Sequence, residues 1–558
     1  MKAFFRFASL TLLSLWMSIS ILGCSQRVVN SVDKTVVSKP IPDQIGATVK
    51  GRVSSNGKGL YNVVVSDGVE VTTTNEDGVY YLASNKKYGY VFVSIPSNYE
   101  VSTVSNLPQF FKYLRTATKE VEIVDFELKP VDNDNHSVVV MTDFHLADRT
   151  DDLVQYAKFV KDVNNSIGEL QSQGKKVYGL TLGDLSWDNY WYSRSFALPE
   201  YVLQMNKLNA TVFNTIGNHD NDPYIEGDWD SGAAYRKYIG PTYYSFNIGQ
   251  IHYVVLDNVD YINEGGRQGK IGKRNYKASI LHEQMNWLKK DLEMVKDKAT
   301  PIVLAMHVQL NNAPKADQSA TIRLDNGKEL MQVLAPFKRV QVLTGHTHVN
   351  YRVENTPNLM EHNIAAVCAT WWWTGKNGYT GNHIAQDGSP GGYMVWNMNG
   401  RDMDWYYKGI DKPKEYQFRA YDLNVVKITA AQFAPNTTEA KMKEYTHGYE
   451  TAGNKNEVLI NVWGYDPKWK VDVTENGVAL KVNRVEAYDP LHMVSYTAMR
   501  LNDNVIPSKG FVTSPSSHFF KTTATSANST LNIKVTDRFG KVYEESMVRP
   551  KKFSVKMM

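Results

Sequence analysis

Cysteine is nearly absent from this chain, since only Cys24 and Cys368 occur in 558 residues. Long apolar runs are also scarce, and the only one of note lies before Cys24. Neither sign of charge dominates, because 62 lysines and arginines face 58 aspartates and glutamates. The shortage of cysteine excludes a disulfide framework. With near-neutral charge and no basic stretch, we expect no nucleic-acid partner.

The N-terminal segment has the features of an export signal. Lys2 and Arg6 accompany an apolar run of roughly 15 residues, which is short for a membrane span. The run ends in Ile21-Leu22-Gly23-Cys24, which resembles the bacterial lipobox, although a plain signal peptide with a chance cysteine is the alternative. We predict a signal peptide over 1–23, a tether over 24–43 and a lipid on Cys24. The protein would then be an exported bacterial lipoprotein, periplasm-facing or displayed at the cell surface.

The length predicts about three domains, because one hydrophobic core does not grow to 558 residues. Residues 44–130 contain short β-type runs with turn signals such as Asn56-Gly57 and Asp77-Gly78. This stretch resembles a small β-sandwich of the transthyretin-like or carboxypeptidase-regulatory type. At the other end, residues 411–558 contain alternating stretches that predict a second β-rich domain. No short-period repeat is present in the sequence.

Residues 136–370 alternate between strand-like and helix-like patterns. The run "HSVVVM" is typical of a strand buried on both faces, and residues 151–173 repeat apolar residues at helical spacing. Such alternation predicts a layered α/β domain. Residues 371–410 follow as a junction rich in aromatic residues and glycine, with a hairpin turning at Asn399-Gly400.

Polar side chains follow strand after strand in the α/β part, where open α/β sheets place their ligands. Burying unpaired carboxylates and imidazoles together is costly, so their convergence needs compensating positive charge, which two divalent cations would supply. Carboxylate, amide oxygen and imidazole without thiolate suit Mn, Fe or Zn. The groups are Asp143-Phe144-His145, Gly183-Asp184, Gly217-Asn218-His219-Asp220, His307 and Gly345-His346-Thr347-His348.

This ordered series of D-x-H, G-D, G-N-H-D, H and G-H-x-H resembles the calcineurin-like metallophosphoesterases over residues 136–370. The resemblance implies a four-layer β-sandwich flanked by helices, with N-terminal and C-terminal β-sandwich domains as in one bacterial branch of the family. It also implies hydrolysis of phosphate esters by two metal ions that share a hydroxide.

Carried over by position, the resemblance assigns each polar residue a role. Asp184 would bridge both metals, and His219 would act on the leaving oxygen as a general acid. Asp222 would orient His219, with Asp220 as the rival and Asp188 as a weaker alternative. The first metal would be held by Asp143, His145 and His348, and the second by Asn218, His307 and His346.

Several alternatives stay open. The substrate is a phosphorylated small molecule, glycan or lipid, and either a monoester or a diester is compatible with the series. A lipid-tethered protein that binds glycans or envelope components, with an inert central domain, is the alternative function. Residues 368–393 either form a wall of the site or pack as a domain junction. Cys368, in "IAAVCAT", is expected to be a small buried apolar residue and not a nucleophile.

Overall fold

The computed structural model describes residues 40–149 and 151–557. The predicted signal peptide, Cys24 and most of the tether lie outside these residues. From Ile41 onward the chain forms one compact unit. Within the described ranges, every helix is too short or too polar to cross a bilayer.

Two small sheets form the N-terminal module. One is built around β1 (Val49–Ser55), which pairs in parallel with β11 and β12 and antiparallel with β2 and β5. The other has the order β10-β6-β3-β4. The strand bounds are β2 Lys58–Gly59, β3 Val64–Ser66, β4 Val71–Thr73, β5 Val79–Leu82, β6 Tyr90–Val93, β10 Phe111–Tyr113, β11 Glu122–Ile123 and β12 Phe126–Glu127.

The central part begins with a five-stranded sheet of order β16-β15-β14-β25-β26. Its strands β14, β15 and β16 are parallel, so their carboxyl ends meet at one edge. We expected residues 371–410 to be a junction, but β25 pairs with β14 and the hairpin β25–β26 completes this sheet. The bounds are β14 Asn135–Met141, β15 Lys176–Thr181, β16 Thr211–Phe213, β25 Gly392–Asn399 and β26 Asp402–Gly409.

A six-stranded sheet of order β17-β18-β21-β22-β24-β23 lies opposite the first. The strands β18, β21, β22 and β24 are parallel, which again gathers their carboxyl ends at one edge. The bounds are β17 Tyr244–Ile248, β18 Ile251–Val255, β21 Ile302–Ala305, β22 Val340–Thr344, β23 Tyr351–Thr356 and β24 Leu359–Asn363.

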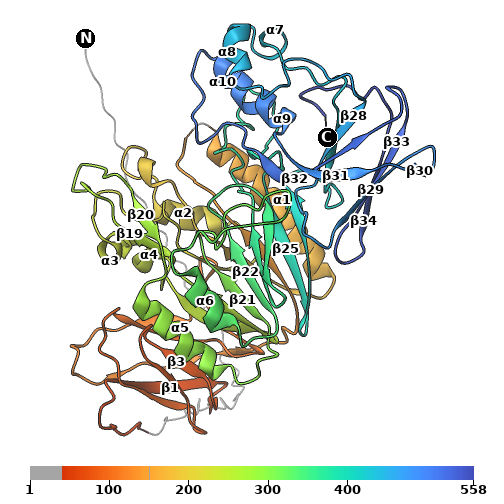
Figure 1. Ribbon diagram of the computed structural model, residues 1–558. Helices are drawn as coiled ribbons and strands as arrows, with labels where there is room; N and C mark the ends of the chain where they lie inside the picture. The colour runs from red at the N-terminus through yellow and green to blue at the C-terminus, as the bar shows by residue number, and fades with distance from the viewer. Residues whose placement is uncertain (1–39, 150, 558) are drawn as a thin grey trace, which may run out of the picture. The chain divides into compact units, whose positions relative to one another are not determined.

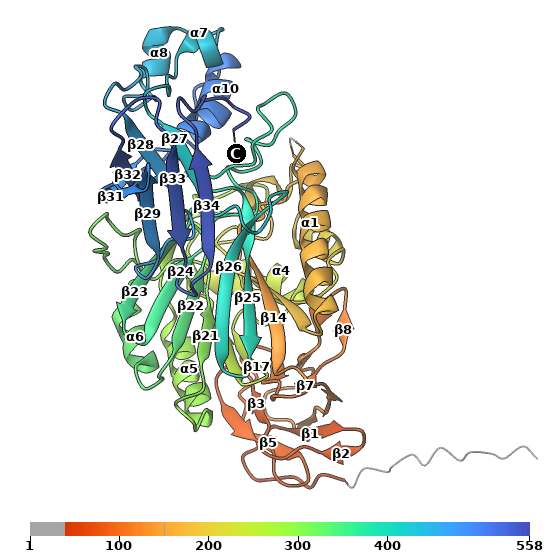
Figure 2. The same ribbon diagram turned by 90° about the vertical axis from the view of Figure 1, so that its right-hand side faces the viewer.

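Helices cover the outer faces of both sheets, which gives four layers (Figure 2). On the first sheet, α1 (Asp152–Ser172) buries Phe159, Val163 and Ile167. On the second, α5 (His282–Met294) and α6 (Gly327–Leu334) bury Trp287 and Leu330. The predicted α/β fold class is therefore confirmed. The shorter helices are α2 Leu198–Met205, α3 Asp228–Ser231, α4 Ala233–Tyr238 and the 3₁₀ turn Asp188–Tyr190.

The C-terminal module contains two four-stranded sheets, β27-β28-β32-β31 and β30-β29-β33-β34 (Figure 1). It also contains the helices α7 to α10 and a π-helical turn, which the alternating sequence pattern did not predict. The bounds are β27 Arg419–Asp422, β28 Glu457–Asn461, β29 Lys470–Glu475, β30 Val478–Ala479, β31 Val482–Ala487, β32 Ser516–Thr523, β33 Leu531–Thr536, β34 Val542–Met547, α7 Ala430–Phe433, α8 Glu439–Lys443, α9 Pro490–His492, the π turn Met493–Thr497 and α10 Ala498–Asn502.

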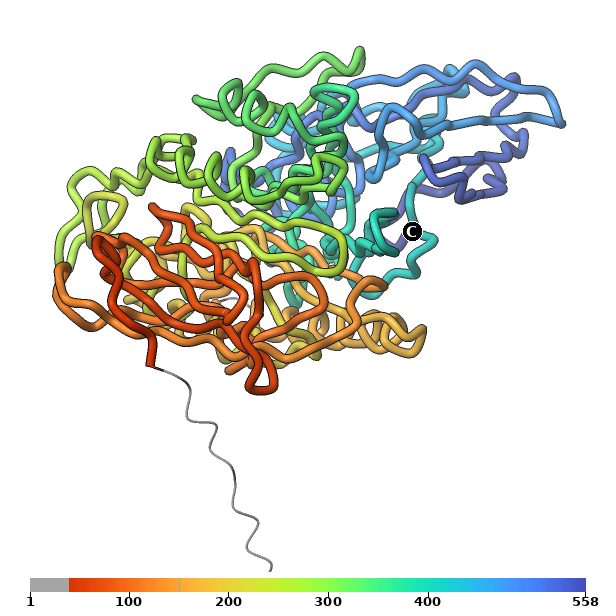
Figure 3. The backbone as a smooth tube through the Cα atoms, turned by 90° about the horizontal axis from the view of Figure 1, so that it is seen from below, coloured from red at the N-terminus to blue at the C-terminus, as the bar shows by residue number. Residues whose placement is uncertain are grey.

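The N-terminal module lies next to α5 of the central part (Figure 1), and the view from below has this module in front (Figure 3). The indole of Trp287 on α5 donates a hydrogen bond to Ser66 of β3 at 3.0 Å. One hydrophobic cluster includes both Phe92 of the module and Trp287 and Ile302 of the central part. The core is therefore continuous across residue 130, and the domain boundaries at 130 and 410 stay a prediction.

Candidate active site

The predicted polar residues gather at the carboxyl ends of both central sheets. Asp143 and His145 follow β14, Asp184 follows β15 and Asn218 follows β16 in the first sheet. In the second sheet, His307 follows β21, and His346 and His348 follow β22. The parallel strands therefore bring together all seven predicted metal ligands.

The turns that carry these residues are unusually tight. Asp143, His145, Asp184, His346 and His348 all have positive φ, a conformation that costs energy and concentrates at functional sites. Neighbouring glycines make room for the turns. A Cβ on Gly345 would lie 1.9 Å from Oγ1 of Thr142, and one on Gly217 would lie 2.2 Å from the backbone nitrogen of Asp184.

A first cluster of donor atoms forms around His145. Its Nε2 lies 3.0 Å from Nε2 of His348, 3.7 Å from Oδ1 of Asp143 and 3.4 Å from Oδ2 of Asp184. Nε2 of His348 is also 3.3 Å from Oδ1 of Asp143. The four residues are buried, so water cannot satisfy these atoms.

A second cluster forms around His307 and shares Asp184. Nε2 of His307 lies 3.2 Å from Oδ2 of Asp184, 3.0 Å from Oδ1 of Asn218 and 3.2 Å from Nδ1 of His346. The outer nitrogens of this cluster have protein partners: Nδ1 of His307 contacts the carbonyl of Leu182, and Nε2 of His346 contacts the hydroxyl of Tyr276. Asp184 therefore lies between two sets of ligand-type atoms.

These clusters fit bound cations better than a hydrogen-bond network. Oδ1 of Asp143 is buried without a hydrogen-bond partner, although carboxylates in that position are normally satisfied. Burial lowers the pKa of both His145 and His346 to about 3, so each imidazole is neutral near pH 7 and has a lone pair to offer. Groups of three such side chains that lie within reach of one ion include His145–Asp184–His219 and Asp184–His307–His346.

His219 lies beside the clusters and contacts a different carboxylate from the one we predicted. Its Nδ1 lies 2.6 Å from Oδ1 of Asp188, which is fully buried. Burial alone would lower the pKa of His219, but Asp188 and Asp184 outweigh this effect, so the pKa lies above its usual value. The acid form of this imidazole is therefore favoured.

The prediction that Asp222 orients His219 is wrong. Its carboxylate accepts a hydrogen bond from the hydroxyl of Tyr192, at 2.7 and 2.9 Å to its two oxygens. The rival, Asp220, accepts backbone hydrogen bonds from Leu185, Ser186 and Gly217 and so fixes two of the turns. Asp188, the weaker alternative, is the partner of His219.

The structure adds contacts that sequence motifs did not indicate. The guanidinium of Arg274 lies 3.2 Å from Oδ1 of Asp188. The indole of Trp371 packs at a tilt against His145, with ring centres 3.9 Å apart and planes 35° apart, and against His348 at 4.6 Å and 30°. Arg149 holds the backbone carbonyl of Trp371 through Nη2 at 2.9 Å. No periodic pattern marks these residues, since each comes from an irregular loop.

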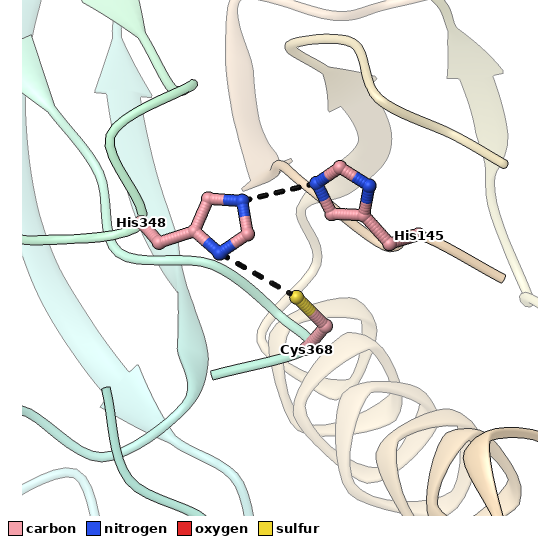
Figure 4. Close-up of side chains that lie close together, drawn as sticks. All are labelled: His145, His348 and Cys368. Carbon is pink, nitrogen blue, oxygen red and sulfur yellow. Dashed lines mark hydrogen bonds between the residues drawn. The ribbon is translucent and has the colours of Figure 1, made fainter. Parts of the chain in front are cut away.

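The segment 368–393 serves both of the purposes that we left open. Trp371 adjoins the site, whereas Nδ2 of Asn382 donates hydrogen bonds to the C-terminal module, at 3.1 Å to Oγ of Ser495 and 2.6 Å to the carbonyl of Val555. Cys368 is buried, as predicted, and its Sγ lies 3.8 Å from Nδ1 of His348 and close enough to His145 for the three side chains to reach one ion (Figure 4). Burial raises the pKa of the Cys368 thiol, which disfavours a reactive thiolate.

Two ligand clusters that share a carboxylate, at the strand ends of a four-layer α/β sandwich, define a dinuclear metallohydrolase. Three family models match the chain in succession. The N terminal of calcineurin-like phosphoesterase matches residues 47–131, calcineurin-like phosphoesterase matches 136–350, and the C terminal of calcineurin-like phosphoesterase matches 361–543. The chain belongs to the calcineurin-like phosphoesterase family, and it is a phosphoric ester hydrolase.

Solved structures give weaker likenesses. A dimetal phosphatase from Danio rerio shares 12% identity over 49% of this chain and 96% of its own, with a TM-score of 0.33. A 5'-nucleotidase from Candida albicans shares 12% identity over 49% of this chain and 50% of its own, with a TM-score of 0.29. Comparison with curated proteins gives no match. With TM-scores this low, the likenesses do not bear on the substrate.

Proposed function

We propose that the chain hydrolyses phosphate mono- or diesters with two divalent ions, using His219 as general acid, outside the cytoplasm. The proposal is supported above all by the two donor clusters that share Asp184 and lie beside His219. Asp143, His145 and His348 would hold one ion with Asp184. Asn218, His307 and His346 would hold the other. The donor set suits Mn, Fe or Zn.

Each part of this arrangement has a chemical task. The two ions would supply a nucleophile near neutral pH and draw negative charge from the phosphoryl oxygens. His219 would donate its proton to the leaving oxygen, and Asp188 would hold the imidazole and favour its acid form. Trp371 would keep His145 and His348 in place by packing against both rings.

The test compares hydrolysis of p-nitrophenyl phosphate with that of bis-p-nitrophenyl phosphate after loading with Mn²⁺, Zn²⁺ or Fe²⁺. We expect turnover that a chelator abolishes and that His346→Ala lowers by at least about 10²-fold. His282→Ala is the matched control, because His282 is exposed on α5. A chain that retains less than about one ion per molecule would instead support the inert binding protein.

The export and lipid anchor are a separate part of the proposal. They are supported by the sequence around Cys24, which lies outside the described residues. Replacing Cys24 by serine should abolish incorporation of labelled palmitate and release the protein from the membrane fraction. Unchanged processing and fractionation of Cys24→Ser would contradict the anchor and leave the hydrolase unaffected.

A further inference from the structure

The hairpin that joins β19 (Val259–Tyr261) and β20 (Tyr276–Ala278) concentrates positive charge beside the site. Our expectation of no basic stretch overlooked it. Between residues 263 and 278 the only carboxylate is Glu264. The cationic side chains of the same segment are Arg267, Lys270, Lys273, Arg274 and Lys277.

A buried amide fixes this hairpin to the loop that follows His219. Nδ2 of Asn263 donates hydrogen bonds to the carbonyls of Pro223 and Ile225, both at 2.9 Å. Oδ1 of Asn263 accepts the backbone N–H of Arg274 at 2.8 Å. Because Asn263 is fully buried, these bonds hold the hairpin in one place relative to the site.

The β20 side of the hairpin base contacts the residues of the site. The guanidinium of Arg274 contacts Asp188, which in turn contacts His219. Two residues further along the chain, the hydroxyl of Tyr276 lies 2.8 Å from Nε2 of His346. The base of the hairpin thus adjoins the leaving-group side of the site, where His219 acts.

Most of this charge lies in no ion pair, although Asp260 of β19 is opposite Lys277 of β20 in the hairpin. Among the described residues, no ion pair involves Arg267, Lys270 or Lys277, and all three are exposed. Lys273 pairs only with Glu264 of the same hairpin. The acidic residues at the base, Glu226 and Asp228, accept backbone N–H groups of Gly265 and Tyr261 and leave the cations unpaired.

We infer that the hairpin 263–278 is a subsite for negative charge on the alcohol half of the substrate. The preferred substrate is then a phosphate ester that has at least one further anionic group, such as a carboxylate or a second phosphate. This inference rests on the proposed function, because it takes the ester phosphate to lie at the two clusters. Unpaired cations on the hairpin raise the local concentration of such anions and add attraction after binding.

The test uses two phosphonates that the enzyme cannot hydrolyse. Hexylphosphonate and 6-phosphonohexanoate have the same metal-binding head, and only the second has an anion at its far end. Calorimetric titration of the Mn²⁺-loaded chain should show at least about fivefold tighter binding of 6-phosphonohexanoate in 50 mM NaCl. The preference should fall below about twofold in 500 mM NaCl, because salt screens exposed charges.

The charge-reversed variant Arg267→Glu/Lys270→Glu should lose the preference, whereas Lys58→Glu should keep it. Lys58 is the matched control because it is exposed, lies in no ion pair and belongs to β2 of the N-terminal module. Equal binding of the two phosphonates by the unmodified chain, or a preference that survives in the double variant, would overturn the inference.

Two further outcomes are distinguished. If the unmodified chain shows no phosphonate preference but binds phosphatidylglycerol vesicles, and the double variant does not, the subsite is refuted and the hairpin faces a membrane. Turnover of p-nitrophenyl phosphate by the unmodified chain is measured separately. Its absence would refute the proposed function, while the phosphonate titration still decides whether the hairpin selects anions.

Discussion

Asp188 contacts both the imidazole of His219 and the guanidinium of Arg274. Because Asp188 is fully buried, it is not screened by water and acts strongly on the protonation of His219. Arg274 limits this effect, since its own charge opposes a second positive charge nearby. The pKa of His219 therefore depends on Asp188, Asp184 and Arg274 together.

We expect Asp188→Asn to lower kcat for phenyl phosphate by about 10²–10³-fold and to affect p-nitrophenyl phosphate much less. Phenolate is the poorer leaving group and depends more on proton donation. Steady-state kinetics with both esters checks this. Asp222→Asn is the matched control and should stay close to the unmodified chain with both esters. Equal losses in the two variants would contradict the role given to Asp188.

At this scale the sequence identified the residues at strand ends. Asp143, Asp184 and His307 each follow a continuous apolar run, and parallel strands force such positions to one edge. Asp188 begins a short 3₁₀ turn and Asp222 lies in a loop, and in neither does spacing along the chain determine which carboxylate faces a given ring. Arg274 was missed for the same reason, whereas Trp371 lies in the segment 368–393 that we had considered as a possible wall of the site.

Among the elements, the turn after β22 depends on a glycine that has no room for a side chain. The expected Cβ position of Gly345 lies 1.9 Å from Oγ1 of Thr142 and 2.6 Å from Oδ2 of Asp143. Relieving this overlap must move β14 or β22 and so separate His348 from Asp143. The geometry of the first cluster is therefore sensitive to one methyl group.

We expect Gly345→Ala to destabilise the fold by about 1–3 kcal/mol and to lower the number of metal ions retained. Thermal unfolding and metal analysis after dialysis measure the two effects. Gly168→Ala is the matched control, because Gly168 is exposed on α1 with open space around it. This control should be stabilised by about 0.5–1 kcal/mol. Full metal retention in Gly345→Ala would contradict the argument.

Helices and hairpins with a clear hydrophobic pattern could be predicted from the sequence, whereas the pairing between distant strands could not. The helix over 151–173 and the hairpin around Asn399-Gly400 both occur. That β25 pairs with β14, more than 250 residues away, follows from the empty edge of the first sheet and not from local pattern. The short helices of the C-terminal module, such as α10, are too brief to establish a helical period.

Across the whole molecule, the C-terminal module reaches the metal clusters through one aromatic contact. Phe511 stacks on Trp371 with ring centres 5.1 Å apart and planes 24° apart. Trp371 in turn packs against His145 and His348. The module therefore supports the ligands of the first cluster from a distance.

We expect Phe511→Ala to weaken metal binding about three- to tenfold, less than is typical when a direct partner of a ligand is removed. Calorimetric titration of the apoprotein with Mn²⁺ measures the change. Phe539→Ala is the matched control, because Phe539 is exposed in the same module and makes an edge-to-face contact with Trp405 instead. If both variants bind Mn²⁺ like the unmodified chain, the C-terminal module does not support the clusters through Phe511.

Each cluster takes its donors from both central sheets. The first joins Asp143 of one sheet to His348 of the other, and the second joins Asn218 to His307. Bound cations would therefore link the two central sheets, and neither sheet alone has all the ligands of a complete site. During synthesis, about 200 residues are added after Asp143 before His348 is made. We therefore expect the metal ions to bind late in folding. A chain truncated before His346 would lack ligands of both clusters and would not retain its ions.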